Sequence, residues 1–160
     1  MNKALFLDRD GVINVHNGYT YTTGAFIFIE GIFDLCRSYA RRGFLIFVIT
    51  NQAGIAKGLF TEDQFLELTA WMLEKFREEG IAIAHVYYCP HHPDITGECS
   101  CRKPEPGMIL QAAEEFNLDL SQCFLYGDMD HDLEAGRRAG IPETNLIFSP
   151  PVPPKGGLLR

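Results

Sequence analysis

The sequence is poor in basic residues and has no long hydrophobic run. It holds 14 Lys and Arg against 21 Asp and Glu, which gives a formal net charge of -7. Such a surface repels nucleic acid and anionic lipid, so neither is expected as a partner. No apolar run is long enough to cross a bilayer, and no basic stretch followed by an apolar run and a cleavage site opens the chain. We therefore expect a cytoplasmic protein, in which an anionic substrate would have to be held by a few local cations.

Internal repeats and low-complexity segments are also absent. The 160 residues fit one domain, and 46% hydrophobic residues with 12 Phe can fill a sizeable core. We predict a single domain over residues 1–149, without a separate substrate domain, and expect a monomer. The remaining residues, 150–160, are rich in Pro and Gly, which is typical of an extended chain end.

Short β-rich runs alternate with helical patterns along the chain. This alternation predicts an α/β fold, in which a Rossmann-like parallel sheet is flanked by helices. The expected strands cover residues 4–7, 45–50, 86–89, 124–127 and 146–148. Three of the expected helices cover residues 32–42, 106–116 and about 132–139. A fourth begins at a capping box formed by Thr61 and Gln64 and ends at Gly80. Its apolar residues lie on one face of the helix and are Phe65, Leu68, Met72 and Phe76.

Polar residues follow four of the expected strands. In open parallel sheets, ligands bind beyond the carboxyl ends of the strands, so these residues are candidates for chemistry. They are Asp8-Arg9-Asp10, Thr50-Asn51-Gln52, Cys89-Pro90-His91 and Gly127-Asp128.

The acidic residues at these strand ends suggest a magnesium site. Asp8 and Asp10 repel one another, and a hard divalent cation would neutralise them. Asp128 can supply a further carboxylate to the same ion. Asp132 lies one helical turn beyond and can either face the site or serve the helix dipole. The alternative for Asp8 and Asp10 is a strand-end turn with solvated acids.

Hydrogen-bond donors and a cation that could bind phosphate also occur among the candidate residues. Thr50 and Asn51 offer a hydroxyl and an amide, although both residue types also cap helices. Lys103 stands just before the helix that opens at Pro106, where an ammonium group can offset phosphate charge. The alternative for Lys103 is a solvated surface position.

A loop over residues 89–101 carries three of the five cysteines. Cys89, His91, Cys99 and Cys101 form a closed four-ligand set, which predicts a structural tetrahedral zinc site rather than a disulfide framework. His92 is the competing ligand, and three reduced cysteines without metal are the alternative. Cys36 and Cys123 are expected in the core.

These motifs, in this order, resemble the haloacid-dehalogenase superfamily of hydrolases. The resemblance implies that Asp8 is the nucleophile that forms an aspartyl-phosphate, and that Asp10 exchanges a proton with the leaving group and with water. It also implies that Thr50 and Lys103 support the phosphoryl group, and that Asp8, Asp10 and Asp128 hold magnesium. The gaps between the motifs are too short for a cap domain, so a capless fold is expected.

The zinc loop narrows the resemblance to the subgroup that contains heptose bisphosphate phosphatases and histidinol phosphatases. Motifs that carry it are Phe6-Leu7-Asp8-Arg9-Asp10-Gly11, Thr50-Asn51-Gln52-Ala53-Gly54-Ile55-Ala56, Tyr88-Cys89-Pro90-His91-His92-Pro93 and Cys101-Arg102-Lys103-Pro104. By this resemblance the substrate contacts are His16, Asn17, Gly18, Tyr19, Asn51, Gln52, Ala53 and Arg102. One departure is Met129, where the heptose members usually have Lys.

The resemblance implies a phosphomonoester hydrolase with a small phosphorylated sugar as substrate. The first interpretation is removal of the 7-phosphate from a heptose 1,7-bisphosphate in lipopolysaccharide precursor synthesis, and Arg102 favours it because a second phosphate needs a cation. The second interpretation is a histidinol-phosphate phosphatase. A third, from another class, is a zinc and phosphate-binding module without catalysis, which would gain nothing from Asp10 beside Asp8.

Overall fold

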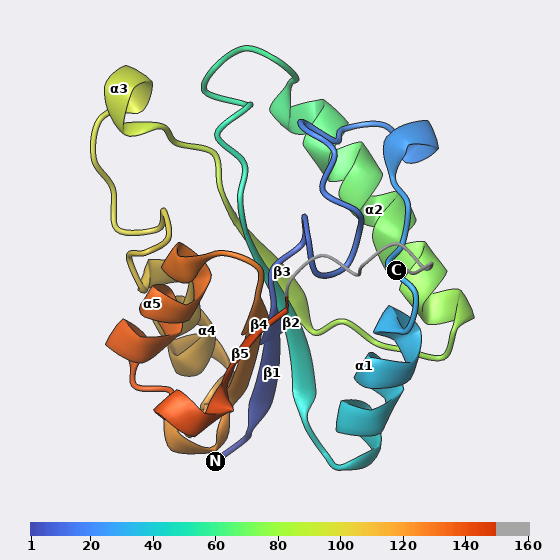
Figure 1. Ribbon diagram of the computed structural model, residues 1–160, viewed down its shortest axis with the longest axis vertical. Helices are drawn as coiled ribbons and strands as arrows, with labels where there is room; N and C mark the ends of the chain where they lie inside the picture. The colour runs from blue at the N-terminus through green and yellow to red at the C-terminus, as the bar shows by residue number, and fades with distance from the viewer. Residues whose placement is uncertain (150–160) are drawn as a thin grey trace.

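A five-stranded parallel sheet lies between two layers of helices in the computed structural model, which describes residues 1–149 (Figure 1). The strands are β1 (Ala4–Leu7), β2 (Leu45–Asn51), β3 (His85–Cys89), β4 (Phe124–Gly127) and β5 (Leu146–Phe148). Their order across the sheet is β3-β2-β1-β4-β5, and every neighbouring pair is parallel. All five strands lie where the sequence predicts them, and the α/β fold class is confirmed. The expected end segment, residues 150–160, lies outside the described residues.

β1 lies at the centre of the sheet, and this position explains why its sequence has no polar residue. All four of its side chains are fully buried, because both faces of the strand are covered. Leu5 and Leu7 pack in one core with residues of α1 (Ile32–Arg41) and α2 (Glu62–Glu78). Ala4 and Phe6 pack in the other core with residues of α4 (Gly107–Phe116) and α5 (Asp130–Ala139). Figure 1 shows these two helix pairs on opposite sides of the sheet.

The capping box predicted for α2 is present. The Thr61 hydroxyl accepts a hydrogen bond from the Gln64 N–H (3.0 Å), and the Gln64 side chain accepts one from the Thr61 N–H (2.9 Å). The buried residues of α2 are the four apolar residues that the sequence placed on one face. The helix therefore begins and faces the core as its local sequence specifies.

α5 begins two residues earlier than predicted. Its first residue is Asp130, and the backbone N–H groups of Asp128 and Met129 both donate to Asp132 Oδ2 at 3.1 Å. The Asp132 carboxylate thus satisfies donors at the helix start, which extends the first turn toward the sheet. This contact also brings Asp132 back toward the end of β4.

Short helical segments within the loops were not predicted. α3 (Pro93–Thr96) lies inside the cysteine loop, and its start is capped by His92 Nδ1, which accepts from the Asp94 N–H at 3.1 Å. The 3-10 segments are η1 (Thr23–Ala25), η2 (Leu120–Gln122) and η3 (Glu143–Asn145). Elements of three or four residues are too short for a hydrophobic period to appear in the sequence. Within residues 1–149, no helix is both long and apolar enough to cross a membrane.

The Thr61→Ala substitution should lower the free energy of unfolding by about 1 kcal/mol, because it removes the acceptor for one otherwise unpaired N–H at the start of α2. Urea denaturation measures this change. Thr22→Ala is the matched control, because Thr22 precedes η1 without a side-chain capping bond. Equal losses from the two substitutions would contradict the role assigned to the capping box.

Candidate active site

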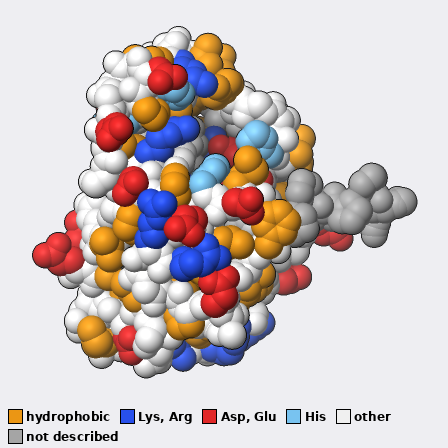
Figure 2. Space-filling view, turned by 60° about the vertical axis from the view of Figure 1, so that its left-hand side comes forward, with side chains coloured by type: hydrophobic (Ala, Val, Ile, Leu, Met, Phe, Trp, Pro, Cys, Tyr) orange, Lys and Arg blue, Asp and Glu red, His pale blue; other side chains and the backbone are white. Residues whose placement is uncertain are grey.

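A cleft of about 230 Å³ opens at the carboxyl ends of the strands, where the sequence predicts the site. Figure 2 shows a hollow on this face with acidic, basic and His side chains gathered around it. The predicted residues that line the cleft are Asp8, Asp10, His16, Gly18, Tyr19, Thr50, Asn51, Gln52, Ala53, Arg102, Lys103 and Asp128. Residues without a predicted role also line it, namely Thr20, Gly54, Lys57, Met129 and His131.

Asn17 is a predicted substrate contact that does not line the cleft. Its side-chain oxygen accepts a hydrogen bond from the Thr20 hydroxyl at 2.7 Å. The contact is internal to the loop, so the structure gives Asn17 a part in shaping the loop that carries His16, Gly18 and Tyr19.

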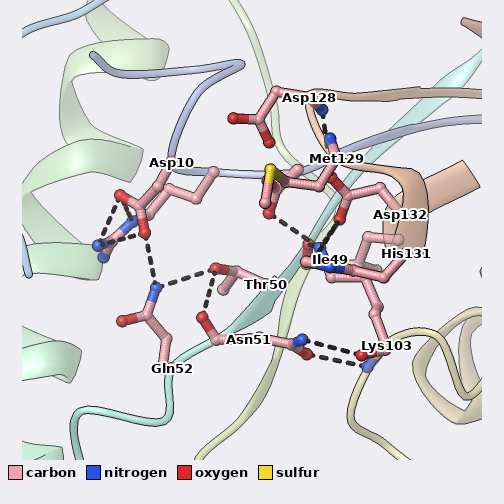
Figure 3. A network of polar contacts seen from close by, with 12 residues as sticks. Asp10, Ile49, Thr50, Asn51, Gln52, Lys103, Asp128, Met129, His131 and Asp132 are labelled. Atoms are coloured by element: carbon pink, nitrogen blue, oxygen red, sulfur yellow. Dashed lines mark hydrogen bonds and ion pairs between the residues drawn. The ribbon is translucent and has the colours of Figure 1, made fainter. Parts of the chain in front are cut away.

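Lys103 joins two carboxylates at the base of the cleft. Its ammonium group lies 2.9 Å from Asp8 Oδ1 and 2.6 Å from Asp132 Oδ1, and it also donates to the Ile49 carbonyl at 3.0 Å. Lys103 and Asp132 are almost completely buried. Figure 3 shows how these contacts connect the end of β2, the loop before α4 and the start of α5. The alternative of a solvated surface position for Lys103 is thereby excluded.

Burial and mutual repulsion change the titration of this cluster. Burial raises the pKa of Asp8 to about 6, although the Lys103 ammonium opposes the shift. Burial also raises the pKa of Asp128 to about 8, and the charges of Asp8 and Asp132 add to the rise. Burial alone would lower the pKa of Lys103, but the adjacent carboxylates of Asp8 and Asp132 outweigh it and raise that pKa. With three carboxylates and one ammonium group, the cluster lacks two positive charges for all of its carboxylates to ionise easily.

The donor set fits a hard divalent cation. Carboxylate oxygens of Asp8, Asp128 and Asp132 lie within 4.8 Å of one another. Asp128 Oδ1 is buried and has no hydrogen-bond partner among residues 1–149. Gly11 allows Asp128 to come this close, because a Cβ at Gly11 would lie 1.9 Å from Asp128 Oδ2. Oxygen donors grouped around a buried, unpaired carboxylate oxygen are what magnesium requires.

The Asp10 carboxylate is not part of this group. It accepts hydrogen bonds from Arg9 (3.0 Å), Asn14 (2.9 Å) and Gln52 (3.3 Å) instead. Figure 3 shows it beside Gln52, away from Asp128 and Asp132. The sequence predicts Asp8, Asp10 and Asp128 as metal ligands. In the structure the Asp132 carboxylate also lies beside Asp8 and Asp128, but its two oxygens contact Lys103 and the N–H groups of Asp128 and Met129. The spacing of residues at the strand end suggested that the Asp10 carboxylate faces the same ion as Asp8. Its hydrogen bonds to Arg9, Asn14 and Gln52 orient it elsewhere.

Arg9 is a buried cation to which the sequence motifs assigned no separate role. Its side chain is 2% exposed, and besides Asp10 it donates to the Thr20 carbonyl at 2.8 Å. It lies close to the Phe26 and Phe65 rings as well. Arg9 thus fixes the Asp10 carboxylate and fastens the loop over residues 14–20 beside the cleft.

The end of β2 supports the backbone of Lys103. Asn51 Oδ1 accepts from the Lys103 N–H at 3.0 Å, and Asn51 Nδ2 donates to the Lys103 carbonyl at 3.2 Å. Thr50 Oγ1 accepts from Gln52 Nε2 at 2.9 Å. Asn51, expected as a phosphate donor, therefore uses both amide atoms to hold Lys103 in place, while Thr50 and Gln52 lie in the cleft wall.

The predicted zinc ligands come together in the loop after β3. One ligand atom from each of Cys89, His91, Cys99 and Cys101 lies within 4.8 Å of the others, while His92 caps α3. Cys99 Sγ lies 3.6 Å from Cys89 Sγ and 3.7 Å from Cys101 Sγ. Zinc–sulfur bonds of about 2.3 Å in a tetrahedron place sulfurs about 3.8 Å apart, so these two separations match a zinc site, whereas the sulfurs of Cys89 and Cys101 are paired with one another.

The sulfurs of Cys89 and Cys101 are the closest pair within this cluster. Cys89 and Cys101 are joined by a disulfide, whereas Cys99 is free, and Cys36 and Cys123 are free and buried as expected. The Cα atoms of Cys89 and Cys101 are 5.6 Å apart, a separation that the sequence could not reveal. Zinc would need both sulfurs as thiolates, so the four-ligand site forms when this pair is reduced.

Similarity to known proteins agrees with this geometry. Residues 100–144 match a family model described as HAD-hydrolase-like. The D-glycero-beta-D-manno-heptose-1,7-bisphosphate 7-phosphatase of Pasteurella multocida is 45% identical over 151 residues, which cover 92% of this chain and 82% of the relative. The D-glycero-alpha-D-manno-heptose-1,7-bisphosphate 7-phosphatase of Burkholderia mallei is 47% identical over 151 residues, which cover 91% and 80%.

A solved structure that resembles this chain is also named as a heptose bisphosphate phosphatase. The D,D-heptose 1,7-bisphosphate phosphatase of B. bronchiseptica, complexed with magnesium and phosphate, is 27% identical and has a TM-score of 0.79, covering 92% of this chain and 93% of that chain. One family accounts for the sheet order, for the acidic residues at the strand ends and for the sequence identity over nine-tenths of the chain. The chain belongs to the heptose bisphosphate phosphatases of the haloacid-dehalogenase-like hydrolases.

Proposed function

We propose that this phosphatase removes the 7-phosphate of D-glycero-D-manno-heptose 1,7-bisphosphate in the cytoplasm, as a monomer, for heptose and lipopolysaccharide precursor synthesis. The observation that carries the proposal is the Asp8–Lys103 pair at the base of a cleft that also holds Asp10 and Arg102. Relatives at 45% and 47% identity are named for the beta and the alpha anomer, so the proposal is for the heptose bisphosphate in general.

Asp8 would act as the nucleophile. Its carboxylate would attack phosphorus, forming an aspartyl-phosphate as the bond from phosphorus to the sugar oxygen breaks. Asp10 would give a proton to that departing oxygen and then accept one from the water that hydrolyses the intermediate. The hydrogen bonds of Asp10 to Arg9 and Asn14 support this role, because they fix its carboxylate beside the cleft.

Lys103 would orient the Asp8 carboxylate and offset negative charge on the phosphoryl group. An ammonium group has three donors, and those of Lys103 face Asp8, Asp132 and the Ile49 carbonyl. A phosphate oxygen would therefore take the place of one of these partners when substrate binds. Thr50, buried in the cleft wall, offers a hydroxyl to the same group.

Two metal ions belong to the proposal. Asp8, Asp10 and Asp128 would hold magnesium, which would supply positive charge to the phosphoryl group, and Asp132 would support the site through its ion pair with Lys103. Cys89, His91, Cys99 and Cys101 would hold zinc once the Cys89–Cys101 pair is reduced. Zinc would be structural, since the four side chains leave no open position, and it would hold the loop that leads to Arg102 and Lys103.

The charges of the cleft favour a bisphosphate over histidinol phosphate. Arg102 and Lys57 line the cleft, and within residues 1–149 neither has a carboxylate at ion-pair distance. A cationic amino alcohol would meet repulsion from these groups, whereas a second phosphate would be attracted. The alternative of a histidinol-phosphate phosphatase is not favoured.

Asp8→Asn should lower kcat for heptose bisphosphate by at least roughly 10³-fold, because the variant keeps the size of the side chain but loses the attacking charge. Asp10→Asn should lower it by roughly 10² to 10⁴-fold through loss of proton transfer. Phosphate release measures both. Asp130→Asn is the control, since Asp130 is an exposed acid of the same region that does not line the cleft. Appreciable turnover by folded Asp8→Asn would refute the mechanism.

Magnesium should raise the melting temperature more at about pH 8.5 than at about pH 5.5. The raised pKa values of Asp8 and Asp128, about 6 and about 8, mean that the metal-free fold favours their protonated forms. This contribution to stability is present below pH 4 or so, and it is lost as the pH rises through these two values. Magnesium needs the ionised forms, so it stabilises most at high pH.

Differential scanning calorimetry with and without magnesium tests this expectation. Asp128→Asn removes one charge of the cluster, so the variant should be more stable than wild type without metal at high pH and should lose most of the magnesium effect. A magnesium effect of equal size at both pH values, or one that Asp128→Asn retains in full, would contradict the assigned ligands.

A further inference from the structure

Lys57 is a cation of the cleft for which the sequence suggested no role. It lies in the turn after β2, it is exposed, and it lines the same cleft as Asp8 and Arg102. Its ammonium group donates to the Tyr19 hydroxyl at 2.7 Å and lies 5.3 Å from the centre of the Tyr19 ring. Both contacts are with a neutral phenol, so they hold the ammonium group without cancelling its charge.

The charge of Lys57 is not cancelled by a carboxylate within residues 1–149. Lys3, Arg41 and Arg42 also lack an ion pair there, but they do not line the cleft. The chain has a net charge of -7, and the helix arginines Arg77, Arg137 and Arg138 all form ion pairs with nearby glutamates. Within residues 1–149, Lys57 has no such partner, and Arg102 donates only to the His91 carbonyl at 3.3 Å. Unpaired cations beside one cleft of an acidic protein indicate an anionic ligand group there.

We propose that Lys57, held by Tyr19, binds the phosphate that is not transferred, together with Arg102; this inference rests on the proposed bisphosphate substrate. Lys103 is occupied at the base of the cleft by Asp8 and Asp132, so it serves the reacting phosphate. Met129 lines the cleft without a charge. Of the three donors on the Lys57 ammonium group, one faces Tyr19 and two remain for phosphate oxygens.

Tyr19 is a positioning residue in this arrangement. It comes from the loop over residues 14–20, which Arg9 fastens through the Thr20 carbonyl. Its hydroxyl directs a long side chain that would otherwise sample many rotamers in solvent. The loop after β1 and the turn after β2 thus meet at the Lys57–Tyr19 contact, and together they place a positive charge at the cleft.

The main test compares two substrates that differ only in the second phosphate, heptose 1,7-bisphosphate and heptose 7-phosphate. Lys57→Met should raise KM for the bisphosphate by roughly tenfold or more, because a charge-assisted contact is lost, and should affect the monophosphate several-fold less. Lys57→Arg should restore most of the loss. Lys75→Met is the matched control, because Lys75 lies on α2 beside Glu78 and Trp71 and does not line the cleft.

Tyr19→Phe tests the positioning role. It should raise KM for the bisphosphate by less than Lys57→Met does, and it should add little in the Lys57→Met background, because both changes then act through one ammonium group. Full additivity of the two substitutions would refute the positioning role of Tyr19. Thermal unfolding of each variant checks that the fold is kept.

The outcomes separate this inference from the proposed function. If wild-type enzyme prefers the bisphosphate and Lys57→Met keeps that preference, or loses equally on both substrates, Lys57 does not bind the second phosphate while the proposed function stands. If wild-type enzyme shows no preference for the bisphosphate, the proposed function fails and this inference fails with it. Loss of the preference in Lys57→Met with recovery in Lys57→Arg supports both.

Discussion

The ion pairs of Lys103 with Asp8 and Asp132 are the interaction on which the rest of the site depends. Three charged groups are buried where β1, β2 and α5 meet, at separations of 2.9 Å and 2.6 Å. A buried charge without a partner costs several kcal/mol, so each member needs the others. Asp128 adds a further carboxylate without a further cation, and burial, together with the charges of Asp8 and Asp132, raises its pKa to about 8. The fold therefore concentrates negative charge beyond what Lys103 neutralises, as a site for a divalent cation requires.

Lys103 depends in turn on the loop that precedes it. Asn51 fixes its backbone through two hydrogen bonds, and Arg102 contacts the His91 carbonyl inside the cysteine loop. The state of the cysteines thus bears on the position of both cations, since Cys101 directly precedes Arg102. This loop has few buried apolar residues, and its cysteine and histidine side chains gather in one cluster instead.

The distribution of charge reconciles an acidic protein with an anionic substrate. The net charge of -7 would repel a bisphosphate from most of the surface, but Lys57, Arg102 and Lys103 all line one cleft. Fields from a few cations within a cleft act over several ångströms and are strengthened where the walls exclude water. Capture of the substrate is then a local property of the strand ends and their loops.

The sequence by itself determined the five strands, the start of α2 and the strand ends that meet at the cleft, because apolar runs and capping residues are local signals. It also brought Asp8, Thr50, Lys103 and the four zinc candidates to attention. The tertiary structure alone decided which side chains face one another: Asp132 rather than Asp10 beside Asp8 and Asp128, and the Cys89–Cys101 pairing. Such choices depend on rotamers and on neighbours many positions away, which no local pattern encodes.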